Sequence, residues 1–154
     1  MTKKANQQDY QSLTTKILSL YRGNQSLNEI TPGASISIET ELDPSLTKAD
    51  SLSGCIAGLE NELPEITYKL KIKSQLFEEI LGISEHKEVS PFKTKEMLML
   101  NINTTITIGV IEKINKDEIG LSLNIPIVAI KGDNVGIARN VNGHWRLIGF
   151  GEII

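Results

Sequence analysis

A period-two alternation of apolar and polar side chains is the feature that most constrains how this chain can fold. It is clearest in residues 66–73, where three lysines and a threonine separate the apolar side chains. Successive side chains of a β-strand point to opposite faces, whereas a helix needs apolar residues three and four positions apart. The segment is therefore predicted to be a strand with an apolar row on one face and a row of lysines on the other.

Similar short segments recur along the chain. Strands are predicted at residues 14–21, 35–39, 54–58, 97–100, 102–110, 119–125, 127–130, 135–139 and 145–154. Three of them, residues 54–58, 97–100 and 127–130, are apolar throughout, which favours strands that are buried on both faces. Pro126 is expected to end the strand before it, because proline cannot donate a hydrogen bond to a neighbouring strand.

Turn signals separate these segments. The strongest is Asn142 followed by Gly143, because both residue types tolerate a positive φ and therefore suit a two-residue hairpin turn. Residues 31–33 and 131–134 carry further turn signals. Residues 42–50 are expected to form a loop that begins with an Asp-Pro turn.

Residues 74–82 are the exception, since their local signals favour a short helix. They combine a serine at the N-cap position with a glycine at the C-terminal end. Elsewhere, helical periodicity is almost absent. Many short strands with closely spaced turn signals predict an all-β barrel or sandwich.

Length and composition set the limits of the domain organisation. The 154 residues suffice for one domain or for two small ones. Residues 60–64 are polar and end at a proline, so they are the preferred domain boundary. Residues 1–11 are mostly polar and are expected to be a disordered lead-in.

Several features bear on the compartment in which the protein works. The first eight residues have no apolar core, which argues against a signal peptide. No apolar run approaches the roughly 18–20 residues that a membrane-spanning helix needs. Cys55 is the single cysteine, so an internal disulfide is excluded and a reducing compartment fits best. We expect a cytoplasmic protein without a membrane partner.

A search for catalytic motifs finds little. A phosphate-binding loop of the form G-x-x-x-x-G-K-[ST] is absent from the sequence. Residues 115–118 resemble a guanine-reading N-K-x-D, but the acid stands one position early, and a turn between strands explains them better. His86 and His144 lie too far apart to suggest a metal site, and Cys55 fits a small core residue. We therefore expect no catalytic, cofactor or metal site on this chain.

Arg139, Trp145 and Arg146 are candidate RNA or partner contacts. They fall on two strands that the hairpin turn joins. Arginine beside an aromatic ring can contact a phosphate and stack a base. The alternative is structural: Trp145 fills the end of a barrel and Arg146 pairs with an acid.

Lysines supply the remaining contact candidates, which are Lys48, Lys69, Lys71 and Lys73. The strand lysines form an exposed row that can meet RNA or an acidic partner, although solubility alone also explains such a row. The formal net charge of −3 argues against a chain that wraps nucleic acid by bulk charge.

Five stretches together resemble the gamma subunit of archaeal and eukaryotic translation initiation factor two. They are LDPSLTKAD at residues 42–50, Leu-Pro at 63–64, KEMLMLN at 95–101, KDEI at 116–119 and WRLIGFG at 145–151. The resemblance runs from about Leu13 to the C-terminus with matching order and spacing. The set is specific to that family, although no single stretch is.

The resemblance implies a fold. The full subunit is similar to elongation factor Tu, in which a GTPase domain is followed by two β-barrels. Residues 63–154 then correspond to the domain-three Greek-key β-barrel, and residues 12–62 to the C-terminal part of the domain-two barrel. The resemblance also assigns residues 74–82 to the end of a strand and the loop after it, which replaces the local expectation of a helix.

The resemblance implies a function as well. The chain would be a non-catalytic C-terminal portion that contributes to subunit assembly and to delivery of initiator methionyl-tRNA to the small ribosomal subunit. Its partners would also include the alpha subunit and the GTPase domain of the gamma subunit, where GTP and magnesium are expected. The alternative is a degenerate or split-gene fragment that acts only as a structural module, self-associating through unpaired strand edges.

Overall fold

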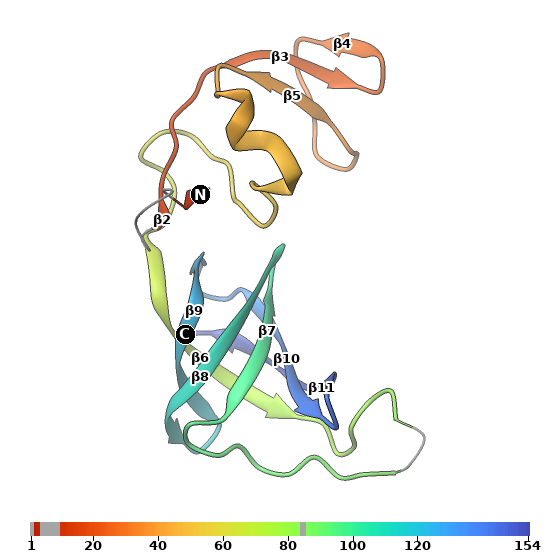
Figure 1. The fold of residues 1–154 in the computed structure, drawn as a ribbon, viewed down its shortest axis with the longest axis vertical. Coiled ribbons are helices and arrows are strands. Elements are labelled where there is room, and N and C mark those ends of the chain that lie inside the picture. The colour runs from red at the N-terminus through yellow and green to blue at the C-terminus, as the bar shows by residue number, and fades with distance from the viewer. Residues whose placement is uncertain (1, 4–9, 84–85) are drawn as a thin grey trace. The chain divides into compact units, whose positions relative to one another are not determined.

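The computed structural model of the chain describes residues 2–3, 10–83 and 86–154 (Figure 1). The chain divides into two compact units, Met1–Leu52 and Ser53–Ile154, which we call the N-terminal unit and the C-terminal unit. At the start of the chain, β1 (Thr2–Lys3) pairs with β2 (Tyr10–Gln11) in an antiparallel two-stranded sheet. None of the helices in the described part of the chain is long and apolar enough to cross a membrane.

The N-terminal unit contains an open three-stranded sheet. Its strands are β3 (Ile17–Arg22), β4 (Gln25–Leu27) and β5 (Ser37–Thr40), in the order β4-β3-β5. Strands β3 and β5 overlap the segments predicted at 14–21 and 35–39. Within residues 12–52, which the structure describes in full, no side chain is buried. The sheet therefore has no apolar core of its own in this structure.

The loop predicted at residues 42–50 is a kinked 3₁₀ helix, η1 (Pro44–Asp50). Asp43 caps it, because its Oδ1 accepts a hydrogen bond of 2.8 Å from the Ser45 backbone N–H. This hydrogen bond lowers the pKa of the Asp43 carboxyl below its ordinary value. The Asp-Pro pair thus starts a capped helical turn rather than an irregular loop.

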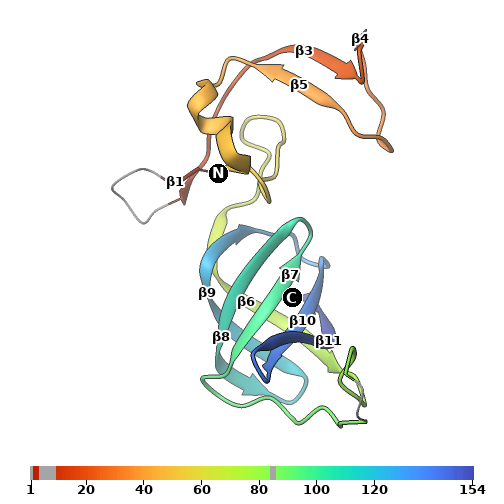
Figure 2. The ribbon, with the colours of Figure 1, turned by 45° about the vertical axis from the view of Figure 1, so that its right-hand side comes forward.

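The C-terminal unit is a closed barrel of six strands (Figures 1 and 2). Its strands are β6 (Ile66–Leu76), β7 (Met97–Ile102), β8 (Thr105–Asn115), β9 (Glu118–Val128), β10 (Asn134–Val141) and β11 (His144–Ile153). Every neighbouring pair is antiparallel, and the order around the barrel is β10-β11-β6-β9-β8-β7. Residues 77–96, the crossover loop, carry the chain from β6 to β7, so that β6 to β9 form a Greek key. The predicted all-β class and Greek-key barrel are confirmed.

Branched apolar side chains fill the interior of the barrel. Fully buried members from different strands are Ile72, Leu98, Leu100, Ile111, Ile119, Ile137 and Ile148. On β6 the three predicted lysines alternate with these interior positions and are exposed, as expected. The hairpin at Asn142 and Gly143 is also confirmed, with φ of 54° and 85° at its two turn residues.

Strands β7 and β8 differ from the prediction. The segment at 97–100 is not covered on both faces, because Met97 is 61% exposed while Leu98 and Leu100 are fully buried. Residues 102–110 are not one strand either, since a turn at residues 103–104 separates β7 from β8. After this turn Ile106 lies on the outside of the barrel, 58% exposed.

A threonine occupies an interior position on β8. Thr107 is only 2% exposed. Its hydroxyl donates to the Ile125 carbonyl oxygen at 2.8 Å and accepts from the Ile125 N–H at 3.1 Å. A buried hydroxyl is tolerated when it is hydrogen-bonded, and here it serves as the partner of the β9 backbone.

Strand β9 does not end at Pro126, contrary to the prediction. Its pairing with β6 is irregular between Thr67 and Lys69, and Pro126 falls in that irregular stretch. The Thr107 hydroxyl bonds the backbone just before the proline, so the strand continues although proline cannot donate to a ladder.

Residues 127–130 are not a separate strand buried on both faces, because β9 ends at Val128 and Ile130 is 58% exposed. Two other segments also differ from their local predictions. Residues 54–58 form no strand, and Cys55 is half-buried rather than a core residue. Residues 74–82 form no helix: β6 continues to Leu76 and a loop follows, with a single bridge between Glu79 and Glu88. The assignment implied by the family resemblance is therefore confirmed over the local helix signals.

Gly149 on β11 offers a direct test of how the barrel closes. A Cβ at this position would lie 2.4 Å from the Gln75 carbonyl oxygen, whereas a Cβ at Gly136 would meet only ordinary contacts, the nearest at 3.6 Å. We expect Gly149→Ala to lower the free energy of unfolding by about 1–3 kcal/mol. Gly136→Ala, the matched control, should change it by less than about 0.5 kcal/mol. Urea denaturation measures both, and equal effects would contradict this account of closure.

Candidate partner-binding face

An exposed apolar surface covers the outside of four neighbouring barrel strands. The strand registers place outward side chains in rows across β8, β7, β10 and β11: Met99 opposes Ile108 and Ala138, and Ala138 opposes Leu147. Residues of adjacent rows extend the surface at both ends. We call it the outer apolar face; its members are Met97, Met99, Ile106, Ile108, Val110, Leu147 and Phe150, whereas Ala138, which lies between Met99 and Leu147 in the register, is itself buried.

Four of these side chains are more than 40% exposed. Met97 is 61% exposed, Ile106 58%, Phe150 44% and Leu147 42%. At one margin, the Phe150 ring packs against Phe77 of the crossover loop, with ring centroids 6.0 Å apart. Single exposed apolar residues are common on protein surfaces, but contiguous apolar surfaces mark sites of interaction.

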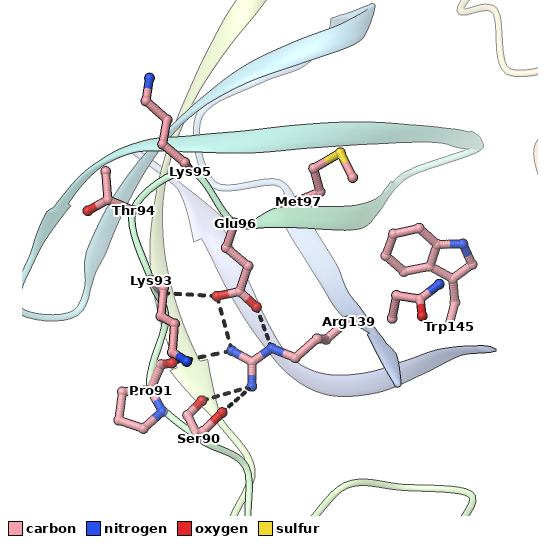
Figure 3. Close-up of a pocket in the computed structure, with 10 residues that line it drawn as sticks. Ser90, Pro91, Lys93, Thr94, Lys95, Glu96, Met97, Arg139 and Trp145 are labelled. Atoms are coloured by element: carbon pink, nitrogen blue, oxygen red, sulfur yellow. Dashed lines mark hydrogen bonds and ion pairs between the residues drawn. The ribbon is translucent and has the colours of Figure 1, made fainter. Parts of the chain in front are cut away.

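A pocket of about 540 Å³ opens at one end of the outer apolar face (Figure 3). It is lined by Ser90, Pro91, Lys93, Thr94, Lys95, Glu96, Met97, Arg139, Asn140 and Trp145. The crossover loop and the start of β7 supply one side, and the β10–β11 hairpin supplies the other. We call it the Trp145 pocket. Met97 belongs to both the pocket and the outer apolar face.

Arg139 holds the crossover loop across the end of the barrel. Its guanidinium donates to the Glu96 carboxylate and, at 2.9 Å, to the Ser90 carbonyl oxygen. The guanidinium also lies 5.9 Å from the centre of the Phe92 ring. The Arg139 and Glu96 side chains are only 14% and 16% exposed. The structure therefore gives Arg139 a structural ion pair.

The sequence-based alternative for the hairpin residues is only partly right. An arginine does pair with an acid, but it is Arg139 rather than Arg146. Arg146 lies opposite Arg139 across the hairpin, with its Nη1 beside Gly82 of the crossover loop. Trp145 is 36% exposed and lines the pocket, so it does not fill the barrel end.

The predicted lysine row lies elsewhere, on β6, which carries no part of the outer apolar face. Lys71 pairs with Glu118 at 2.7 Å, and Lys73 lies 3.6 Å from Asp117. Both lysine side chains are more than half exposed, so these pairs contribute little to stability. Lys69 is exposed, and Lys48 is exposed on η1 of the N-terminal unit.

Lys93 and Lys95 are pocket residues that sequence reasoning missed. Lys93 begins a tight turn and Lys95 lies within it: the Glu96 N–H donates to the Lys93 carbonyl oxygen at 3.1 Å, and the Lys93 N–H donates to the Glu96 carboxylate at 2.9 Å. Lys95 itself has a φ of 67°. No local sequence signal separates these two lysines from other surface lysines.

Among the described residues, no group of three or more His, Cys, Asp and Glu could hold a metal ion. His86 is highly exposed and contacts Glu79 at 2.7 Å. The exposed apolar side chains and the pocket lining make the outer apolar face and the Trp145 pocket the candidate binding surfaces of this unit.

Comparison with known proteins identifies similar sequences. The family described as "Initiation factor eIF2 gamma, C terminal" matches residues 68–153. The translation initiation factor 2 subunit gamma of Methanococcus maripaludis is 46% identical over 142 residues, which cover 92% of this chain and 35% of the relative. The subunits of Methanocaldococcus jannaschii and Pyrococcus horikoshii are 44% and 40% identical over 144 residues. The chain spans about a third of the length of the curated relatives it matches.

The Arg139–Glu96 pair generates a testable prediction about the barrel end. Arg139→Met leaves the Glu96 carboxylate largely buried without its cation, so we expect the free energy of unfolding to fall by about 2 kcal/mol or more. The double variant Arg139→Met/Glu96→Met should lose less than the sum of the two single variants. A double-mutant cycle in urea measures the coupling, expected at about 1–2 kcal/mol. Additive effects would show that the pair does not hold the loop.

Proposed function

This chain belongs to the gamma-subunit family of translation initiation factor 2, and we propose that it is a non-catalytic part of that subunit which supports its assembly and the delivery of initiator methionyl-tRNA to the small ribosomal subunit. It corresponds to the C-terminal part of the subunit, because the matching family description covers residues 68–153. In this proposal GTP and magnesium are held by a GTPase domain outside these residues, and the protein works in the cytoplasm.

The observation that carries the proposal is the outer apolar face. Covering exposed apolar side chains is favourable by roughly 25 cal/mol for each Å² removed from water. The match covers 35% of the Methanococcus maripaludis subunit, so about two thirds of that protein lies outside it. We propose that the GTPase domain of the gamma subunit packs on this face. Exposed Met97 and Ile106 would then become interface residues.

The remaining partners are assigned to other surfaces. We propose that residues 12–62 are the C-terminal part of the domain-two barrel, which contacts the alpha subunit and the tRNA through surfaces that include Lys48. Residues 63–154 are then domain three. The exposed lysines of β6 and Arg146 are proposed to contact RNA of the small ribosomal subunit or the tRNA. These lysines point away from the barrel interior, which supports such a role.

One observation favours a second candidate function, a structural module that self-associates. The N-terminal sheet exposes Ile17, Leu18 and Ile38 at 55%, 52% and 45%. Its outer strands β4 and β5 each have one neighbour within the sheet, and unpaired strand edges can pair with another copy. Sedimentation velocity over a range of concentrations tests this candidate, because a monomer at all of them would exclude it.

Ile106 provides the test of the main proposal. The binding partner is the part of the Methanococcus maripaludis gamma subunit that this chain does not match, produced as a separate fragment. We expect it to associate with the 154-residue chain, and we expect Ile106→Lys to weaken the association at least tenfold, which is about 1.4 kcal/mol. Isothermal titration calorimetry measures the affinity, and thermal melting checks that the variant is folded.

Ile130 is the matched control, because it is also 58% exposed but lies outside the outer apolar face. Ile130→Lys should change the affinity less than about twofold. Absence of association by the unsubstituted chain, or an equal loss in the two variants, would overturn the assignment of the face.

A further inference from the structure

We propose that the Trp145 pocket binds an acidic polypeptide segment that carries a large apolar side chain. The inference goes beyond the proposed function, which places the rest of the gamma subunit on the outer apolar face and gives the pocket no ligand. It rests on the charge of the pocket rim, the apolar wall, and the surface onto which the pocket opens.

The charge of the pocket favours an anionic ligand. Glu96 is the only acidic lining residue, and its carboxylate is neutralised by Arg139. Lys93 and Lys95 are both exposed and have no acidic counterpart among the lining residues. The lining therefore includes two lysines that its own residues do not balance, of which Lys95 extends its side chain away from the Glu96–Arg139 pair (Figure 3). Unbalanced positive charge attracts a carboxylate.

One wall of the pocket is apolar and accessible. Met97 and Trp145 lie on one side of the Glu96–Arg139 pair, and Lys93 lies on the other (Figure 3). Met97 is 61% exposed and Trp145 36%. Tryptophan and methionine are enriched at protein interfaces, where aromatic anchors carry much of the binding energy. A volume of about 540 Å³ is large enough for one bulky side chain beside a carboxylate.

The surroundings of the pocket distinguish a polypeptide from RNA. Beyond the pocket, Met97 pairs with Val110 across strands β7 and β8, and Leu147 lies two positions after Trp145 on β11. A ligand that leaves the pocket on this side crosses apolar side chains. A phosphate backbone would lose hydration there without finding cations, and RNA affinity depends on several phosphate contacts. A polypeptide with acidic and apolar residues matches both the lysines of the rim and the apolar wall of the pocket formed by Met97 and Trp145.

The turn that presents the lysines is fixed before any ligand arrives. Lys95 has a left-handed φ of 67°, a conformation that is unfavourable for a residue with a side chain. Two hydrogen bonds between Lys93 and Glu96 hold the turn in this state. Ligand binding therefore loses little conformational entropy in ordering the backbone of this turn.

The single tryptophan of the chain makes the pocket directly observable. Trp145 is that tryptophan, so its fluorescence reports on the pocket alone. The probe is a short tryptophan-free synthetic peptide in which Asp and Glu alternate with Leu and Phe. We expect a saturable change in Trp145 emission when the peptide is titrated into the full 154-residue chain, with a matching binding heat by calorimetry.

Charge reversal tests the role of the rim. We expect Lys93→Glu/Lys95→Glu to weaken peptide binding at least tenfold. The control Lys116→Glu/Lys131→Glu makes the same change in net charge at exposed lysines that do not line the pocket, and it should have less than about a twofold effect. A peptide with Gln and Asn in place of its acids should bind at least tenfold more weakly.

Four results would overturn the proposal. They are no binding heat, heat without a change in Trp145 emission, equal losses in the two double variants, and single-stranded RNA binding more tightly than the acidic peptide. The titration uses this chain alone, so its outcome does not depend on whether the rest of the gamma subunit associates with the outer apolar face.

Discussion

Closure of the barrel by β6 is the constraint on which the rest of the C-terminal unit depends. This strand is hydrogen-bonded to β9 on one side and to β11 on the other, so the sheet has no free edge. A closed sheet must send alternate side chains inward and outward on every strand. At this seam Gly149 leaves no room for a Cβ beside the Gln75 carbonyl oxygen. Once the interior is full, the apolar side chains that remain outside are available for binding.

The crossover loop links closure to the binding surfaces. It spans the barrel end between β6 and β7, and Arg139 of β10 fixes it through Glu96 and Ser90. The same ion pair lines the Trp145 pocket and lies between Lys93 on one side and Trp145 on the other (Figure 3). A contact that stabilises the fold thus also shapes the pocket, while the outer apolar face depends on the strand registers alone.

Local patterns in the sequence predicted most barrel strands and the hairpin turn, because alternation and turn chemistry are local properties. They did not predict which face of β8 lies inside. Alternation identifies which residues share a face, but packing decides which face is buried. Thr107 is tolerated in the interior because its hydroxyl is hydrogen-bonded to the Ile125 backbone. Trp145 and Arg139 were recognised as site candidates, whereas the Glu96 partner of Arg139, 43 residues away, left no local signal.

Oxidative footprinting of Met97 tests most directly the claim that the outer apolar face joins this chain to the rest of the gamma subunit. Mass spectrometry would follow oxidation of Met97 by hydroxyl radicals in the chain alone and in its complex with the unmatched part of the Methanococcus maripaludis subunit. Leu81, which is 51% exposed outside the face, serves as the reference. The account predicts that the oxidation rate of Met97 falls several-fold in the complex while that of Leu81 is unchanged. An unchanged Met97 rate in a formed complex would contradict it.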